Sequence, residues 1–418
     1  MKILFINISD IQGGSAKAAF RLGQQLERNF NTKNLFLVRT KLSNEKNVLQ
    51  TRQNQIEHFF ERAINIFMNL IGLQYQWLPF SPKFVLKKAA EFQPDIISLH
   101  NTIGGYFRTK DLAKLSNIAP IVWTMHDMWP ITRNCAHTFG DESFTKMKSF
   151  PGERKIFPWI GIDSGSFLLR KKKTDYETSD ISFVCPSLWL YNLACKSPLL
   201  DGKKISHIYH GIDTDKFRIM DKAEVRKSLG INPDSKVLMF VAEKLKSNSW
   251  KGGLDLSDVV KELSHKFTGK ITLILLGNTA GYKIDESKID IVTPGYINNE
   301  EELVKYYNAS DIFIYPTKAE SFGLVLAEAI ACGTPCASYD VGPVAEIIKN
   351  GVSGITVQAG DTSKLVSKIL ELLQNESNLQ NLSKTSREHA EDNFSLDKMA
   401  QNYLSLFKKV LVNKNNSQ

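Results

Sequence analysis

The 418-residue sequence has few of the residues that build disulfide frameworks or metal clusters. Its five cysteines are odd in number, irregularly spaced and without a C-x2-C pair, and the closest two, Cys332 and Cys336, have no histidine nearby. Disulfide-rich scaffolds and structural zinc sites need more cysteines at regular spacing. The sequence therefore predicts reduced thiols and no metal site.

Long hydrophobic runs and nucleic-acid motifs are absent as well. The apolar start, Met1 to Ile6, is too short for a signal peptide, and no run approaches the roughly 18 apolar residues of a membrane span. The net charge of +9 would suit nucleic acid, but no basic stripe interleaved with aromatic residues and no zinc or RNP motif accompanies it. We expect a cytoplasmic protein that binds an anionic substrate or an acidic membrane surface, and no nucleic acid.

The length and the apolar pattern predict two α/β domains. Single cores stop growing near roughly 250 to 300 residues, so this chain is long enough for two. Short apolar runs alternate with helical patterns, which is typical of a parallel, doubly wound sheet. The first series of expected strands is Lys2 to Ile8, Asn34 to Val38, Asp95 to Leu99, Ile121 to Met125 and Ile181 to Cys185. The second series is Val237 to Val241, Ile271 to Leu276, Ile289 to Val292 and Ile312 to Tyr315.

Polar residues follow two strands of the first series. Ser98, His100 and Asn101 come at the end of one strand, and His126 and Asp127 follow the next. Ligands bind at the carboxyl ends of the strands in open sheets, so these residues are candidates for a site.

The segment from strand Ile312 to Tyr315 into the next helix is the most informative part of the chain. Pro316 stops the strand, Ser321 can cap a helix, and Leu324 to Ile330 repeats apolar residues at helical spacing. A helix start offers free backbone N–H groups and the positive end of the dipole, and Gly323 lets a ligand approach the backbone. The segment therefore predicts a turn that binds phosphate and sugar.

Two glutamates in this segment give it a resemblance to a known family. Glu320 and Glu328 stand in E-S-F-G-L-V-L-A-E, followed by A-I-A-C-G-T-P, which resembles the E-x7-E signature of retaining GT-B glycosyltransferases of family 4. The resemblance implies that Glu320 contacts the donor sugar and that Glu328 binds the ribose hydroxyls. The residues implied to bind the donor diphosphate are Ser321, Phe322, Gly323 and Leu324.

Other segments resemble the same family. Trp123 to Pro130 resembles the bacterial polysaccharide enzymes of the colanic-acid and capsule type, in which the histidine faces the donor sugar. This implies that His126 faces the sugar and that Asp127 orients it; a structural histidine at a strand end is the alternative. Family members hold the diphosphate with an arginine and a lysine, and here Lys251 is the expected phosphate ligand, with Lys244 in place of the arginine.

Two glycine-containing loops are further candidates for donor binding. Gly13 and Gly14 lack the G-x-G-x-x-G pattern of a dinucleotide site, and the resemblance places them near the donor diphosphate or the acceptor. An ordinary tight turn is the alternative. Gly295 and Tyr296 follow a strand of the second series and would pair with the nucleobase, uracil or guanine; a plain strand exit is the alternative.

The resemblance implies a GT-B fold, in which two Rossmann-like, doubly wound parallel-sheet domains face a cleft. Residues 1–210 would form an N-terminal acceptor-binding domain and residues 211–395 a C-terminal nucleotide-sugar-binding domain. A C-terminal helix within residues 396–418 would pack back on the first domain.

The function implied is a metal-independent, retaining hexosyltransferase that needs no cofactor. It would move a hexose from a UDP- or GDP-sugar to a glycan or lipid-linked acceptor in surface polysaccharide biosynthesis. A nucleotide-sugar epimerase on the same fold and a catalytically silent subunit of a glycan-assembly complex are the alternatives. The apolar stretch from Ala63 to Phe80 is either a packed core helix or a peripheral contact with the inner face of the cytoplasmic membrane.

Overall fold

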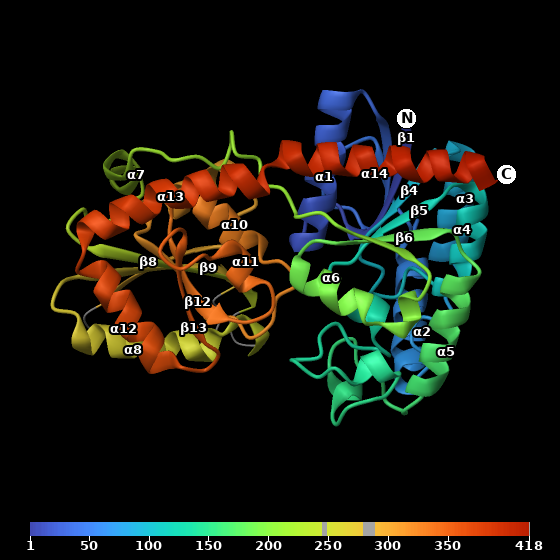
Figure 1. The fold of residues 1–418 in the computed structure, drawn as a ribbon, viewed down its shortest axis with the longest axis horizontal. Helices are drawn as coiled ribbons and strands as arrows, with labels where there is room; N and C mark the ends of the chain where they lie inside the picture. The colour runs from blue at the N-terminus through green and yellow to red at the C-terminus, as the bar shows by residue number, and fades with distance from the viewer. Residues whose placement is uncertain (245–248, 279–288, 418) are drawn as a thin grey trace. The chain divides into compact units, whose positions relative to one another are not determined.

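The chain forms two compact units (Figure 1). The structure, a computed structural model, describes residues 1–244, 249–278 and 289–417. The first unit contains Met1–Gly211 together with Leu396–Gln418, and the second contains Ile212–Ser395. No helix in the described part of the chain is both long and apolar enough to cross a membrane.

A parallel sheet forms the centre of the first unit. Its described residues make seven strands in the order β3-β2-β1-β4-β5-β6-β7. These strands are β1 (Lys2–Ser9), β2 (Lys33–Thr40), β3 (Val48–Gln50), β4 (Ile96–Leu99), β5 (Ile121–Thr124), β6 (Ile181–Cys185) and β7 (Lys204–His207). Every residue of β4, β5 and β6 is buried, as expected for central parallel strands that are covered on both faces. The edge strands β3 and β7 are short and half-buried, which is why no apolar run predicted them.

The helices of the first unit include one from the far end of the chain. They are α1 (Gly14–Phe30), α2 (Gln55–Leu70), α3 (Ser81–Phe92), α4 (Leu112–Ile118), α5 (Gly165–Glu177), α6 (Leu188–Cys195) and α14 (Leu396–Ser417). The core of this unit contains Met399, Tyr403 and Phe407 of α14 beside Phe5 of β1. The Tyr403 hydroxyl also forms a hydrogen bond of 2.8 Å with Thr124 at the end of β5. α14 is therefore a structural part of the first sheet's core.

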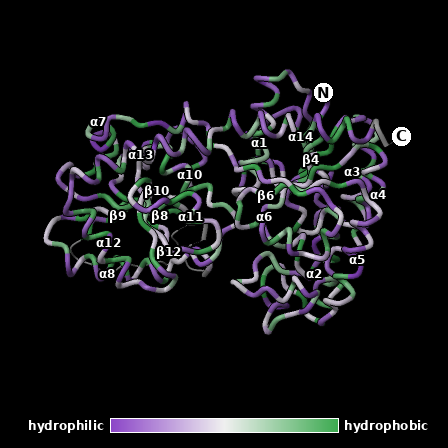
Figure 2. Tube along the Cα trace, in the orientation of Figure 1, coloured by the Kyte–Doolittle hydropathy of each residue, from purple (hydrophilic) through white to green (hydrophobic). Residues whose placement is uncertain are grey.

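A second parallel sheet forms the centre of the second unit. Its described residues make six strands in the order β10-β9-β8-β11-β12-β13. These are β8 (Lys236–Lys244), β9 (Ile271–Asn278), β10 (Ile289–Gly295), β11 (Ile312–Tyr315), β12 (Cys336–Asp340) and β13 (Gly354–Gln358). The helices are α7 (Lys222–Ser228), α8 (Gly253–Lys266), α9 (Glu300–Ala309), α10 (Leu324–Ala331), α11 (Val344–Ile347), α12 (Thr362–Leu373) and α13 (Glu376–Phe394). Figure 2 shows the hydrophobic residues along β8 and β9.

The strand order of each sheet creates one preferred place for a ligand. The order reverses beside the first strand of each series, so β1 lies between β2 and β4, and β8 lies between β9 and β11. Ligands of open parallel sheets bind outside the carboxyl ends of the strands at this switch point. The predicted doubly wound α/β architecture is confirmed in both units.

Candidate functional site

The switch point of the second sheet brings together a lysine, a glutamate and a tyrosine. Lys251 follows β8, whereas Glu320 lies in the loop that follows β11. The ammonium of Lys251 forms an ion pair with the carboxylate of Glu320, and the hydroxyl of Tyr315, the last residue of β11, donates to Glu320 Oε1 (2.7 Å). The side chain of Lys251 is 31% exposed and that of Glu320 is 11% exposed. Two predicted site residues from distant parts of the sequence therefore lie in contact and remain accessible.

A close backbone approach positions Lys251 against this loop. Thr317 Oγ1 and the Lys318 amide both donate to the carbonyl oxygen of Trp250, at 3.0 and 2.7 Å. Gly252 has a φ of +74°, and a Cβ atom there would lie 1.8 Å from the carbonyl oxygen of Pro316. Only glycine allows the turn after β8 to pack this closely on the loop after β11.

Lys251 and Tyr315 both stay protonated near neutral pH. Burial alone would lower the pKa of Lys251, but the carboxylate of Glu320 and the side chain of Tyr315 raise it above its ordinary value. Burial and the charge of Glu320 raise the pKa of Tyr315, so its hydroxyl stays protonated and can donate. The group can offer an ammonium to an anionic ligand and a carboxylate to sugar hydroxyls.

The start of α10 differs from the expectation in one respect. Gly323, not Ser321, occupies the N-cap position, and no side chain caps the helix. The prediction of a Ser321 cap was wrong because Gly323 adopts a φ of +102° and delays the start of the helix to Leu324. In the first turn of α10 the Leu326 amide donates to the Gly323 carbonyl (2.9 Å). The preceding amides are those that a phosphate would use at a helix start.

Two other predicted residues of this segment are buried. The ring of Phe322 packs against Phe394 with centroids 5.8 Å apart, so only its backbone could meet a diphosphate. Glu328 is 1% exposed and accepts a hydrogen bond from the Tyr307 hydroxyl (3.3 Å). The two glutamates thus occupy different environments, and the contact of Glu328 with ribose stays a prediction.

The remaining donor candidates of the second unit lie at the ends of β10 and β8. Gly295 ends β10 with a φ of +85° and open space around it, and Tyr296 is half exposed. β10 is two strands away from β8, or roughly 10 Å at ordinary strand spacing. Lys244 ends β8, but its side chain lies outside the described part of the chain, so its phosphate contact stays a prediction.

A cluster of histidines occupies the carboxyl edge of the first sheet. His100 Nδ1 and His126 Nε2 are 2.9 Å apart, and His100 Nε2 lies 3.0 Å from Ser98 Oγ. The ring of His126 also stacks on that of His210, with centroids 5.0 Å apart. Burial lowers the pKa of His100 to about 3, with a contribution from the charge of His210, and burial and His100 lower that of His126. The rings are therefore neutral near pH 7, and each has one donor and one acceptor nitrogen.

His126 and Asp127 have different contacts. Asp127 Oδ1 accepts the backbone amide of Trp129 (2.8 Å) and so stabilises the turn after β5. Burial raises the pKa of Asp127 to about 6. Asp127 contacts the turn after β5, so its role in orienting His126 stays a prediction. His100, which follows the neighbouring strand β4, is the residue in hydrogen-bond contact with the ring of His126.

Gly13 and Gly14 lie at the switch point of the first sheet. Gly13 is the N-cap of α1 with a φ of +88° and open space where a Cβ would be, and Gly14 begins the helix. Nearby, Asn7 Oδ1 accepts the amide of Asn101 (3.2 Å) and Asn7 Nδ2 donates to the carbonyl of Ser15 (3.1 Å). This asparagine joins the end of β1 to the loop after β4 and to the start of α1.

Several functional candidates were not assigned from the sequence. The sequence predicts His100 only as a polar residue after a strand, and it predicts no role for His210 or Tyr315. Ser98 and His100 are two residues apart and thus share a face, which was the available signal. The contacts of His100 with His126 and of Tyr315 with Glu320 depend on the tertiary fold.

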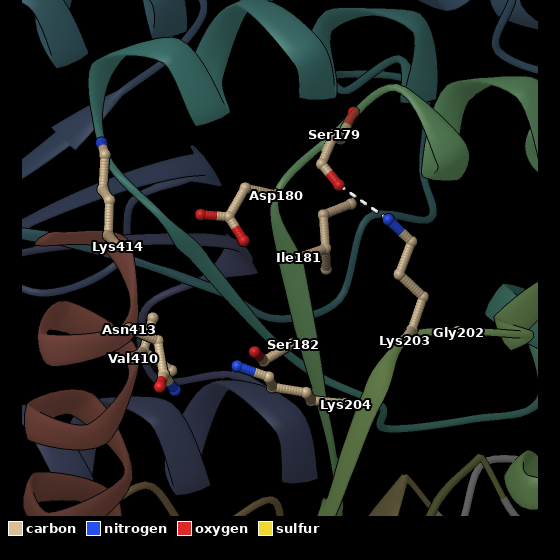
Figure 3. A pocket seen from close by; sticks show the side chains of 10 residues that line it. All are labelled: Ser179, Asp180, Ile181, Ser182, Gly202, Lys203, Lys204, Val410, Asn413 and Lys414. Atoms are coloured by element: carbon tan, nitrogen blue, oxygen red, sulfur yellow. Dashed lines mark hydrogen bonds between the residues drawn. The ribbon is translucent and has the colours of Figure 1, made fainter. Parts of the chain in front are cut away.

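A separate cavity of about 380 Å³ lies in the first unit between the starts of β6 and β7 and the end of α14 (Figure 3). Lys203, Lys204 and Lys414 line it together with Asp180. Lys203 donates to the Ser179 carbonyl (2.8 Å), and the cavity is at the edge of the sheet opposite the strand carboxyl ends. Its position separates it from the candidate site.

Comparisons with known proteins bear on this geometry. Residues 221–389 match the family model described as glycosyl transferases group 1, and this range contains Lys251, Glu320 and Glu328. A D-inositol 3-phosphate glycosyltransferase 2 of Catenulispora acidiphila is 27% identical over 322 residues, which cover 73% of this chain and 69% of that protein. An N-acetyl-alpha-D-glucosaminyl L-malate synthase of Bacillus anthracis is 25% identical over 52% of this chain and 57% of its own length.

The fold has relatives among solved structures. The structure of Anabaena Alr3699/HepE in complex with UDP-glucose superposes with a TM-score of 0.67 at 17% sequence identity, covering 98% of this chain and 100% of that one. The likeness, at this identity, concerns the fold alone. The two parallel sheets and the likeness to solved structures show the GT-B fold, and the unit that carries Lys251 and Glu320 matches the model of group 1 glycosyl transferases over residues 221–389.

Proposed function

We propose that this glycosyltransferase moves a hexose from a nucleoside diphosphate sugar to a hydroxyl of a glycan or lipid-linked saccharide, with retention of the anomeric configuration. The observation that carries the proposal is the contact between Lys251 and Glu320 at the switch point, beside the start of α10. An ammonium and helix amides suit the diphosphate, and a carboxylate suits the sugar hydroxyls. The group thus matches both parts of a nucleotide sugar.

The reaction places a growing negative charge beside Lys251. The bond between the anomeric carbon and the phosphate oxygen breaks, and the acceptor oxygen forms a bond to the same carbon. The proton of the acceptor hydroxyl passes to the departing phosphate oxygen on the same face, so no covalent enzyme intermediate is needed. Lys251 and the first amides of α10 would stabilise the diphosphate more strongly as its charge develops. Glu320 would hold the hydroxyls of the oxocarbenium-like ring.

The other predicted residues complete the donor site in this proposal. His126 would face the sugar as a neutral ring, and Glu328 would contact the ribose. Gly295 and Tyr296 would meet the nucleobase, which a nucleotide extended along the carboxyl edge from Lys251 could reach across roughly two strand spacings. The Anabaena HepE structure is a complex with UDP-glucose, which favours uridine over guanosine for the donor of this chain.

Two acceptor classes are supported by different observations. The names of the relatives, a D-inositol 3-phosphate glycosyltransferase and an L-malate synthase, favour a small anionic acceptor. The resemblance of the sequence around His126 to capsule-type enzymes favours a saccharide carried on lipid at the inner face of the cytoplasmic membrane. We favour the lipid-linked saccharide, because the first unit also exposes an extensive apolar surface on α2.

Transfer assays with labelled sugar donors test the proposal. UDP- and GDP-hexoses would be supplied with a lipid-linked saccharide, inositol phosphate or malate, and label should move to an acceptor only when one is present. Turnover of the sugar without any acceptor would indicate an epimerase instead. No turnover, with intact donor binding, would indicate a silent binding subunit.

A substitution tests the assignment of the site. Glu320→Ala should abolish transfer while the fold, monitored by circular dichroism, is retained. Glu388→Ala removes an exposed carboxylate on α13 and should leave transfer unchanged. If Glu320→Ala turns over as fast as Glu388→Ala, the proposed site is incorrect.

A further inference from the structure

Helix α2 exposes most of its apolar side chains. Their spacing of three and four residues forms a single stripe, and all are exposed: Ile56, Phe59, Phe60, Ala63, Ile66, Phe67 and Leu70. Phe59 is 69% exposed and Phe67 is 59% exposed. The charged Glu61 instead points inward, where it is fully buried and paired with Arg52 (2.8 Å). A surface helix normally has the opposite arrangement, so this stripe needs an apolar partner.

A second segment extends the stripe of α2. The loop before α5 exposes Phe157, Trp159 and Ile162. The amides of Gly161 and Ile162 donate to the carbonyls of Asn69 (2.8 Å) and Leu70 (3.0 Å), so this loop packs on the end of α2. We call the stripe and this loop, together with the exposed Trp77, Phe80 and Phe167, the apolar surface.

Two acids beside the apolar surface are paired within the protein, whereas two cations are exposed. Glu153 is buried and pairs with Arg133 (3.4 Å), and the exposed Asp163 is also ion-paired with Arg133. Arg62 and Lys155, in contrast, are exposed. Glu153 and Asp163 are thus neutralised by Arg133, and the half-buried Glu57 of α2 accepts the backbone amide of Gln53 (2.8 Å), while Arg62 and Lys155 are exposed.

We propose that the apolar surface docks this protein on an anionic lipid bilayer. Its aromatic and aliphatic side chains would enter the interface to a depth of roughly 5 to 10 Å, while Arg62 and Lys155 would meet acidic head groups. The side chains protrude from the outer side of a helix and from a loop. A fluid bilayer accepts such a shape without a matching groove, whereas a protein partner would have to provide one, so the bilayer is the favoured occupant.

The apolar surface is joined to the carboxyl edge of the first sheet. Arg52 Nη2 donates to the carbonyl of Gly105 (2.6 Å), in the loop that begins at His100. The indole of Trp129 donates to Gln74 Oε1 (2.7 Å), which ties the segment after α2 to the loop that follows His126. Docking would bring the bilayer to this edge, where a lipid-linked acceptor could be presented; only this last step rests on the proposed function.

Vesicle flotation tests the docking directly, without reference to activity. The full chain should float with vesicles of phosphatidylcholine mixed with phosphatidylglycerol, and less with phosphatidylcholine alone or at high salt. The double variant Phe59→Glu with Phe67→Glu should reduce the floated fraction at least tenfold. Val412→Glu changes an exposed apolar residue of α14 outside the apolar surface and should float as the unaltered protein does.

Charge reversal tests the electrostatic part of the docking. Arg62→Glu with Lys155→Glu should remove the preference for phosphatidylglycerol, whereas Lys408→Glu with Lys409→Glu, the same charge change on α14, should keep it. Circular dichroism would establish that each variant is folded. The proposal is overturned if the unaltered protein does not float, or if the double phenylalanine variant floats equally well. It is also overturned if the unaltered protein is a dimer that this variant dissociates and neither binds vesicles, because the surface then joins two copies.

Discussion

Replacing Gly252 by alanine should move Lys251 away from Glu320. A Cβ at this position would lie 1.8 Å from the carbonyl oxygen of Pro316, whereas ordinary contact begins at 3.4 Å. The turn that carries Lys251 must therefore retreat by about 1.6 Å from the loop that carries Glu320. The left-handed backbone adds a cost of about 1–2 kcal/mol for any residue with a Cβ.

The displacement of the turn that carries Lys251 sets the expected loss of kcat/KM. A misplacement of about 1 Å in a catalytic group can reduce the rate by about 100-fold. We expect Gly252→Ala to lower kcat/KM for the nucleotide sugar by about that factor, measured in steady-state transfer assays. The free energy of unfolding, measured by urea denaturation, should fall by about 1–2 kcal/mol.

A substitution at a second glycine, Gly351, separates the effect of backbone strain from the effect of displacing Lys251. Gly351 has a similar φ of +77°, but a Cβ there would meet no atom within 4 Å. Gly351→Ala should therefore lose stability to a similar extent and keep its kcat/KM. The reasoning is refuted if Gly252→Ala retains the original kcat/KM, or if Gly351→Ala loses as much activity.

Three further predictions concern the two sheet edges. Tyr315→Phe removes the hydroxyl that donates to Glu320 and should lower kcat/KM about tenfold in the same assay, since a hydrogen bond to a charged group contributes about 1.5–3 kcal/mol; an unchanged value would contradict it. His100 has a lowered pKa, so the folded protein binds fewer protons than the unfolded chain, and stability is complete above pH 6.5 and lost below it. From pH 6.5 to 5.5 His100 alone should cost about 1 kcal/mol of unfolding free energy, and urea denaturation of His100→Gln should show a correspondingly smaller loss. Activity should also survive EDTA, because the ammonium of Lys251 can meet the charge of the diphosphate without a divalent ion; a loss restored by a divalent ion would refute metal independence.

The fold was predictable where local sequence marks the ends of apolar runs. Strands β6 and β11 agree with the expected bounds, since Pro186 and Pro316 stop their apolar runs. The helix start after β11 was not predictable, because Gly323 adopts a left-handed conformation that moves the start past Ser321. A short polar residue caps a helix only if the residues that follow it directly adopt the helical conformation.

The site was predictable where a motif names the residues. Lys251 and Glu320 were expected to act on one ligand, and the fold brings them into contact; their roles stay predictions. The partner of His126 was not predictable, because His100 reaches it from a neighbouring strand and the pairing of strands is not written in the local sequence. The environment of α2 was not predictable for a related reason. The apolar periodicity is the same whether the stripe faces a core or another surface, and only the tertiary structure shows that Phe59 and Phe67 are exposed while Glu61 is buried.

The membership of α14 in the first unit has a consequence for synthesis on the ribosome. The residues that complete the core around Phe5 are translated only after the whole second unit, Ile212–Ser395, has been made. The second unit is continuous in sequence and can fold as soon as it leaves the ribosome. Residues 1–211 of the first unit are made earlier, but the site where Tyr403 and Phe407 pack stays exposed until α14 is made. A nascent chain interrupted before Leu396 would thus expose that site to chaperones and proteases, even though nearly all of its residues are present.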